Sequence, residues 1–131
     1  MTKTEIPIQT QGTATTIVEM GKNTALAVGS GNLNVFATPM MVALMEEAAC
    51  NALADFLTDE ESTVGTLVHV SHVSPTPVGD TVTATATVTA VEKRKIIFYL
   101  TAKDGHHTIG TGTHERFVIN AKSFMEKLAQ R

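Results

Sequence analysis

The order of hydrophobic and polar positions predicts a strand, a long helix, four more strands and a short closing helix. Apolar and polar residues alternate weakly over 13–20, a segment rich in Thr, Ile and Val, which predicts a strand. Met, Ala and Leu dominate residues 39–57, which predicts a helix that buries most of its circumference. Segments rich in Val, Thr, Ile or aromatic residues predict the later strands, over 63–74, 80–92, 95–103 and 108–120. Residues 121–130 predict a short amphipathic helix.

This order of elements predicts an α+β fold. A loop is expected over 21–34, with Gly29-Ser30-Gly31-Asn32 as its flexible centre. A long apolar helix followed by antiparallel strands favours a layer in which a strongly curved sheet wraps the helix. Such a sheet leaves a strand edge that can pair with a second chain. The pattern contains no repeat and no internal boundary, so residues 1–131 are expected to form a single domain.

Composition narrows the possible classes without pointing to a function. The chain is 43% hydrophobic and 18% charged, with a formal net charge of −3, which argues against disorder and against nucleic-acid binding. The densest basic run, Lys93-Arg94-Lys95, lies between two predicted strands and is interpreted as a turn, with contact to a ligand phosphate as the alternative. Cys50 is the single cysteine and is expected to be a small core residue. The sequence has no membrane-spanning run and no signal-peptide pattern, so a cytoplasmic protein without membrane contact is expected.

The start of the long helix carries the first candidate chemistry. Thr38 is predicted to cap the helix, and Pro39 suits its first turn. Glu46 follows two turns later among apolar neighbours, whereas Glu47 points about 100° away and lies on the side of Asn51. Because a carboxylate on an apolar flank needs a hydrogen-bonding partner or a chemical role, Glu46 is the candidate and Glu47 is a solvated residue.

The strand that follows the helix separates two histidines by alternation. His72 shares a face with Val64, Val68 and Val70, whereas His69 lies on the other face. His72 is therefore the histidine expected to point inward. A lone inward histidine is more often a hydrogen-bonded core residue than a catalyst, and this alternative stays open for His72 taken singly.

Three polar residues on neighbouring elements favour a catalytic site. Thr38, Glu46 and His72 are all expected to point inward, and they combine a hydroxyl, a carboxylate and an imidazole. The chain has no His-Glu-x-x-His or Cys-x-x-Cys spacing, so no metal or other cofactor is expected. His106 and His107 follow Asp104-Gly105 and are interpreted as part of an exposed turn.

Several short motifs occur in one order: Val35-Phe36-Ala37-Thr38, Leu44-Met45-Glu46, Gly65-Thr66, Val70-Ser71-His72, Thr76-Pro77-Val78-Gly79 and Gly110-Thr111-Gly112-Thr113-His114-Glu115-Arg116. With these motifs the chain resembles the fluoroacetyl-CoA thioesterase family of hot-dog proteins, from about residue 35 to the C-terminus. The resemblance implies a long central helix wrapped by a curved antiparallel sheet, and a homodimer with the active site between its subunits. It also implies hydrolysis of a short-chain acyl-CoA thioester to a carboxylate and free CoA.

The resemblance also assigns roles to residues. The catalytic threonine, glutamate and histidine of the family fall on Thr38, Glu46 and His72. The glycine beside the thioester falls on Gly65, and the active-site arginine falls on Arg116. Pairing with a neighbouring carboxylate is the structural alternative for the arginine, and no role follows for the histidine two residues before it.

One segment departs from the family pattern. The fluoroacetyl-CoA enzyme has a longer lid with aromatic residues before the catalytic threonine, whereas residues 27–34 are fewer and contain no aromatic side chain. Short-chain thioesterase activity is therefore expected, and selectivity for a fluorinated acyl group is left open. The alternative function is a non-catalytic acyl-CoA-binding or sensing module on the same fold. A hot-dog hydratase is disfavoured because its Asp and His pair is missing from the central helix.

Overall fold

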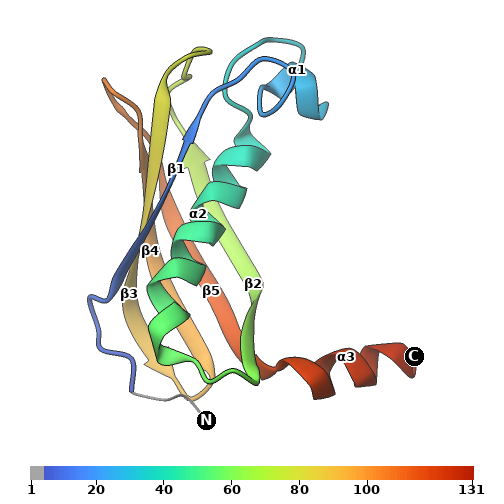
Figure 1. The fold of residues 1–131 in the computed structure, drawn as a ribbon. Helices are drawn as coiled ribbons and strands as arrows, with labels where there is room; N and C mark the ends of the chain where they lie inside the picture. The colour runs from blue at the N-terminus through green and yellow to red at the C-terminus, as the bar shows by residue number, and fades with distance from the viewer. Residues whose placement is uncertain (1–4) are drawn as a thin grey trace.

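One curved antiparallel sheet curls around a central helix in the computed structural model, which describes residues 5–131 (Figure 1). The elements in chain order are β1 (Gln11–Ile17), α1 (Ala25–Val28), α2 (Thr38–Leu53), a 3₁₀ turn (Ala54–Phe56), β2 (Glu61–His72), β3 (Thr81–Glu92), β4 (Lys95–Lys103), β5 (Thr108–Asn120) and α3 (Ala121–Ala129). The strands lie in the order β1-β3-β4-β5-β2, so β1 and β2 are the edges of the described sheet. The predicted α+β arrangement is confirmed.

The predicted loop over 21–34 contains a short helix, α1, which is a correction to the sequence analysis. Thr24 caps this helix, because its hydroxyl accepts a hydrogen bond of 3.2 Å from the backbone N–H of Ala27. Gly29 ends it in the left-handed conformation, with φ of 78°. This helix has only four residues, about one turn. A periodic hydrophobic pattern can be recognised only over several turns, so the sequence did not predict it.

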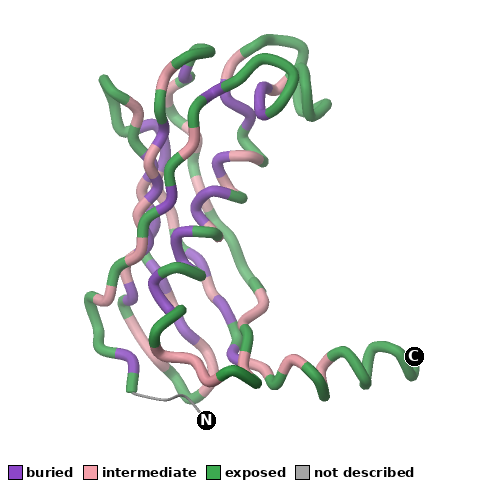
Figure 2. The backbone as a smooth tube through the Cα atoms, in the orientation of Figure 1, coloured by how far each residue is buried: buried purple, intermediate pink, exposed green. Residues whose placement is uncertain are grey.

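The hydrophobic core lies between α2 and the concave face of the sheet. The helix buries the side chains of Met41, Leu44, Met45, Ala48, Ala49, Ala52 and Leu53. The sheet meets them with buried residues of β3 and β4, namely Val82, Ala84, Ala86, Val88, Ile96, Phe98, Leu100 and Ala102. Figure 2 shows buried residues along the side of α2 that faces the strands. Burial of each large apolar side chain contributes about 1.5–3 kcal/mol, so this layer supplies the main stabilisation of the fold.

The opposite side of α2 is open in the single chain. Ala43, Glu47 and Cys50 are exposed on this side. The expectation that Cys50 is a core residue is therefore wrong. It fails because the sheet covers one flank of the helix rather than its whole circumference.

A β-bulge in β2 changes which side chains share a face. The register of β2 with β5 shifts between Gly65 and Leu67, so one extra residue reverses the alternation there. His72 shares the inward face with Val70, as predicted, because their partners Gly110 and Gly112 lie on the inward face of β5. Val64 was wrongly grouped with them, because it lies on the other side of the bulge.

The β2 edge of the sheet is open. Every residue of β2 is exposed or half-buried, and Leu67 and Val68 expose 44% and 38% of their surface. α3 leaves the body of the molecule at the end of β5 and projects past this edge (Figure 1). Met125 and Leu128 of α3 are also exposed, at 61% and 40%. Large apolar side chains are therefore exposed on this side of the molecule.

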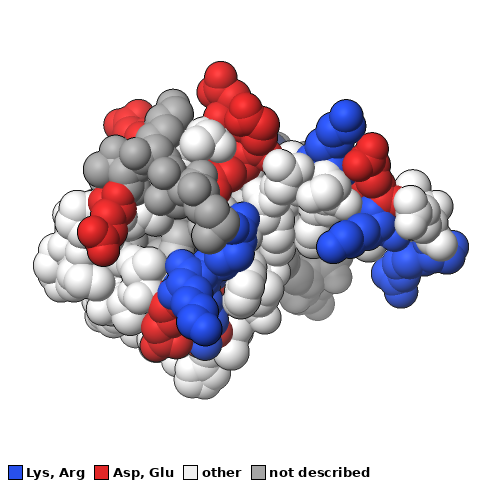
Figure 3. Space-filling view, turned by 90° about the horizontal axis from the view of Figure 1, so that it is seen from below, with Lys and Arg blue, Asp and Glu red and all other residues white. Residues whose placement is uncertain are grey.

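The basic run is a turn, as predicted. It joins β3 to β4, where Lys93 takes a positive φ of 60° and Arg94 donates a hydrogen bond of 2.8 Å from Nε to the carbonyl of Val118. Lys95 lies 3.5 Å from a carboxylate oxygen of Glu92. Figure 3 shows the molecule from the end where α3 departs, and acidic side chains lie beside the basic ones on this face. Among residues 5–131, no helix is both long and apolar enough to cross a membrane.

Candidate active site

Thr38 and His72 form a direct hydrogen bond at the start of α2. The Thr38 Oγ1 atom lies 2.7 Å from Nδ1 of His72. The prediction that Thr38 caps the helix is wrong, because Ala37 is the N-cap residue and Thr38 is already the first helical residue. Pro39 lies in the first turn, as predicted. The hydroxyl is thus directed at the imidazole instead of at the helix backbone.

A small cleft surrounds this pair. The cleft holds about 260 Å³, and Val35, Phe36 and Pro75 line it together with Thr38 and His72. Pockets for drug-sized ligands hold about 300–1,000 Å³, so this cleft suits a small group. An aromatic side chain therefore does lie beside Thr38, although it belongs to Phe36 rather than to the segment over 27–34.

His72 is a neutral imidazole at the cleft. Burial lowers the pKa of His72 below its ordinary value, so the imidazole is neutral at pH 7 and can accept a proton. Its Nε2 atom is buried and has no hydrogen-bond partner within residues 5–131. Buried polar atoms are normally paired, so the unpaired Nε2 atom makes His72 a candidate functional residue.

Thr38 and His72 form one cluster of polar side chains, and Glu46 belongs to a second cluster. Its Oε2 atom accepts a hydrogen bond of 3.0 Å from Nη1 of Arg116, and its side chain is 37% exposed. Thr63 holds Arg116 through two hydrogen bonds. Its hydroxyl accepts one of 2.9 Å from Nε, and its backbone carbonyl accepts one of 3.1 Å from Nη2. The expected partner of the carboxylate is therefore an arginine from β5, and Glu47 is exposed as predicted.

Gly65 lies directly against this second cluster. A Cβ atom at this position would come within 2.5 Å of Oε2 of Glu46 and 3.2 Å of Nη1 of Arg116. A larger residue would displace the ion pair, so the absence of a side chain allows the carboxylate to approach β2.

His114 is a member of the same cluster that sequence reasoning missed. Its side chain is fully buried, and its Nε2 atom lies 3.2 Å from Nη1 of Arg116. Its Nδ1 atom lies 2.7 Å from the carbonyl oxygen of Leu67. A signal was present, because residues two apart on a strand share a face and Arg116 was already a candidate.

A single chain keeps the two clusters apart. Thr38 and Glu46 are separated by eight residues of α2, which corresponds to about 12 Å along the helix axis. The structure thus unites Thr38 with His72, and Glu46 with Gly65 and Arg116, but it does not join the two sets. Thr38 is exposed rather than inward, because it lies where the curved sheet ends.

We expect the stability of the fold to decrease as the pH falls below about 6.5. Burial lowers the pKa of both His72 and His114, so the unfolded chain binds protons more readily than the folded chain. The two histidines contribute their full stabilisation above the pKa of histidine in the unfolded chain. This contribution is lost as the pH falls from there through the lowered pKa values of the folded protein. Thermal unfolding followed between pH 7.5 and 5.5 should show a fall of roughly 3 °C.

Matched variants identify the source of this effect. The double variant His72→Gln with His114→Gln should flatten the dependence on pH. The variant His69→Gln, at an exposed position on the same strand, should leave it unchanged. An unfolding temperature that is constant over this range in the parent protein would contradict the assignment.

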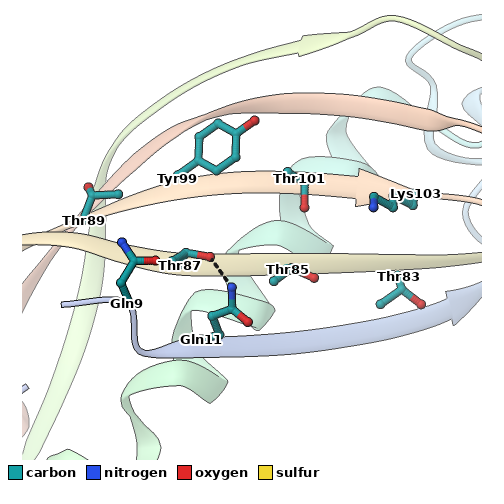
Figure 4. A pocket seen from close by; sticks show the side chains of 9 residues that line it. All are labelled: Gln9, Gln11, Thr83, Thr85, Thr87, Thr89, Tyr99, Thr101 and Lys103. Carbon is teal, nitrogen blue, oxygen red and sulfur yellow. Dashed lines mark hydrogen bonds between the residues drawn. The ribbon is translucent and has the colours of Figure 1, made fainter. Parts of the chain in front are cut away.

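A larger hollow lies on the convex face of the sheet, away from both clusters. It holds about 530 Å³, and polar side chains of β1, β3 and β4 line it, among them Thr85, Thr87 and Tyr99. Figure 4 shows these side chains on the face of the sheet turned away from α2, with Gln11 donating a 3.0 Å hydrogen bond to Thr87. Lys103 is the one charged residue that lines it, so the hollow lacks an acid and base pair. Within residues 5–131, no group of three His, Cys, Asp or Glu side chains could hold a metal ion.

Comparison with known proteins gives one consistent result. The sequence model of the family described as fluoroacetyl-CoA-specific thioesterase matches residues 20–122. The fluoroacetyl-CoA thioesterase of Streptantibioticus cattleyicolor is 45% identical over 97 residues, which are 74% of this chain and 70% of that protein. A serine-for-threonine variant of the thioesterase FlK in complex with acetyl-CoA superposes with a TM-score of 0.85 at 36% identity, covering 95% of this chain and 97% of the other. A hot-dog-like protein from Thermanaerovibrio acidaminovorans superposes with a TM-score of 0.85 at 25% identity, covering 96% and 93%. The hot-dog fold expected from the resemblance is confirmed.

Proposed function

The chain belongs to the family of fluoroacetyl-CoA-specific thioesterases, and on that premise we propose that it hydrolyses short-chain acyl-CoA thioesters in the cleft beside Thr38. The hydrogen bond of 2.7 Å between Thr38 and His72 carries the proposal. A hydroxyl within hydrogen-bond distance of a neutral imidazole is the arrangement that activates a weak nucleophile. The volume of the cleft, about 260 Å³, favours a short acyl chain.

In the first half of the proposed reaction, Thr38 attacks the thioester carbonyl. Nδ1 of His72 accepts the hydroxyl proton as the bond from Oγ1 to the acyl carbon forms. The developing oxyanion lies near the N-terminus of α2, where the partial positive charge of the helix stabilises it. The carbon–sulfur bond then breaks, and the proton on His72 passes to the CoA thiolate. The products of this half are an acyl ester on Thr38 and free CoA.

In the second half, Glu46 activates water. The carboxylate removes a proton from a water molecule as the water oxygen attacks the acyl carbon. It then passes that proton to Oγ1 of Thr38 as the bond from Oγ1 to the acyl carbon breaks, which restores the Thr38 hydroxyl and the Glu46 carboxylate and releases the acid product, which ionises in water. Arg116 holds the carboxylate in position through the 3.0 Å hydrogen bond to Oε2. Glu46 and Thr38 of one chain lie about 12 Å apart along one helix. This half of the reaction therefore needs the Glu46 of a second copy of the chain.

A homodimer supplies it in this proposal. The open β2 edge exposes unpaired backbone groups together with Leu67 and Val68, which favours pairing with another copy of the same strand. Antiparallel pairing of two β2 edges about a two-fold axis would direct the His72 end of one copy toward the Gly65 region of the other. The exposed apolar residues of α3 support an interface on this side of the molecule.

A panel of acyl-CoA substrates tests the function. With a thiol reagent as the readout, acetyl-CoA and propionyl-CoA should release CoA, and hexanoyl-CoA should react with a kcat/KM at least about tenfold lower, because the cleft is small. Fluoroacetyl-CoA should react at a rate similar to acetyl-CoA, since residues 27–34 contain no aromatic lid.

The variant Thr38→Val is the matched control, because it keeps the shape of the side chain and removes the hydroxyl. Its rate should fall while acyl-CoA binding persists. Saturable binding of every acyl-CoA to the parent protein without thiol release would overturn the proposal in favour of a binding or sensing module.

A further inference from the structure

The neighbours of His114 determine where its ring proton lies. The carbonyl oxygen of Leu67 can only accept a hydrogen bond, so the Nδ1 atom at 2.7 Å must carry the proton. The guanidinium of Arg116 can only donate, so the Nε2 atom at 3.2 Å must be bare. Both constraints select the same neutral tautomer of the imidazole. Burial also lowers the pKa of His114, which keeps this neutral form at pH 7.

Arg116 is tied down through four of its five N–H groups. The two on Nη1 point to Glu46 and to His114, whereas Nε and one N–H of Nη2 bind Thr63. Thr63 fixes one edge of the planar guanidinium, and His114 fixes the direction of the Nη1 group at its far end. One N–H of Nη1 donates to His114. The planar geometry of the group then directs the other N–H toward Glu46.

We propose that His114 is a positioning residue that holds Arg116, and through it Glu46, in the geometry needed for hydrolysis. The proposal rests on the function proposed above, in which Glu46 activates water. The imidazole is suited to this task because Phe98 stacks against it, with ring centroids 5.8 Å apart, and because it is fully buried. It acts through an acceptor lone pair and does not itself exchange a proton with the substrate.

Two substitutions separate positioning from simple packing. His114→Phe keeps a ring of similar size against Phe98 but removes the acceptor for Arg116. His114→Gln loses the ring but places a carbonyl oxygen near the position of Nε2. Positioning predicts that the phenylalanine variant loses kcat by about 10- to 100-fold with little change in KM, and that the glutamine variant stays within about threefold of the parent. A packing role predicts the reverse order.

The second readout does not depend on activity. The Nη1–H resonances of Arg116, the group that His114 contacts, should be protected in low-temperature ¹H–¹⁵N spectra of the parent and of His114→Gln, and broadened or lost in those of His114→Phe. Thermal unfolding should confirm that both variants fold. A parent protein that hydrolyses no acyl-CoA would remove the proposed function, while the arginine resonance would still decide whether His114 orders Arg116. Full activity and an unchanged resonance in His114→Phe would overturn the inference.

Discussion

Replacing Glu46 with glutamine is expected to lower kcat for acyl-CoA hydrolysis by about 10²- to 10⁴-fold. The glutamine carbonyl can still accept the hydrogen bond from Nη1 of Arg116, so the local geometry is preserved. The amide cannot remove a proton from water, and the second half of the proposed reaction therefore stops. An acyl ester on Thr38 should accumulate during turnover, and mass spectrometry of the intact protein measures it directly.

The adjacent residue provides the control. Glu47→Gln removes the same charge from the same turn of α2, but this side chain is exposed and points away from Arg116. It should change kcat by less than about twofold. Near-parental hydrolysis by Glu46→Gln, or an equal loss in Glu47→Gln, would sink the assignment of Glu46 as the base.

The largest expected effect on stability is at Gly12 of β1. A Cβ atom here would overlap the backbone nitrogen of Ala52 and the backbone oxygen of Ala48. These are helix backbone atoms rather than the ends of flexible side chains, so α2 would have to move away from β1. Asn51 resists that movement, because its Nδ2 atom donates a hydrogen bond of 2.8 Å to the carbonyl of Thr13. Gly12→Ala is therefore expected to cost at least about 3 kcal/mol of unfolding free energy.

Chemical denaturation measures this cost, and a second glycine calibrates it. A Cβ atom at Gly105 meets no heavy atom within 4 Å, and its φ is not in the left-handed region. Gly105→Ala should therefore shift the unfolding free energy by less than about 0.5 kcal/mol. Equal stability of the two variants would contradict the close packing of β1 on α2 at Gly12.

Local patterns predicted the parts of the candidate site that depend on helical and strand periods. The 100° step between neighbouring helical residues separated Glu46 from Glu47, and the structure places the second in solvent. Alternation placed His72 on the inward face, where it contacts Thr38. The same alternation failed for Val64, because the bulge between Gly65 and Leu67 carries no signal in the sequence.

Contacts between distant segments were beyond the reach of these patterns. His114 received no role, because its importance comes from Leu67 and Arg116 meeting around its ring. Cys50 was misassigned for a related reason, since an apolar helix does not reveal which flank a sheet covers. Capping by Thr38 was a sound local expectation, yet the hydrogen bond to His72 took its place.

By itself, the sequence determined the order of the elements, the phase of α2 and the residue types that make up the chemistry. These properties depend on interactions between residues a few positions apart, so local patterns in the sequence are sufficient to predict them. Only the tertiary structure decided which groups meet. The hydrogen bond between Thr38 and His72 joins residues 34 positions apart, and the one between Glu46 and Arg116 joins residues 70 positions apart. The structure also decided that these pairs form two clusters along one helix, because β2 brings His72 to the first residue of α2 whereas β5 brings Arg116 to Glu46, two turns further on.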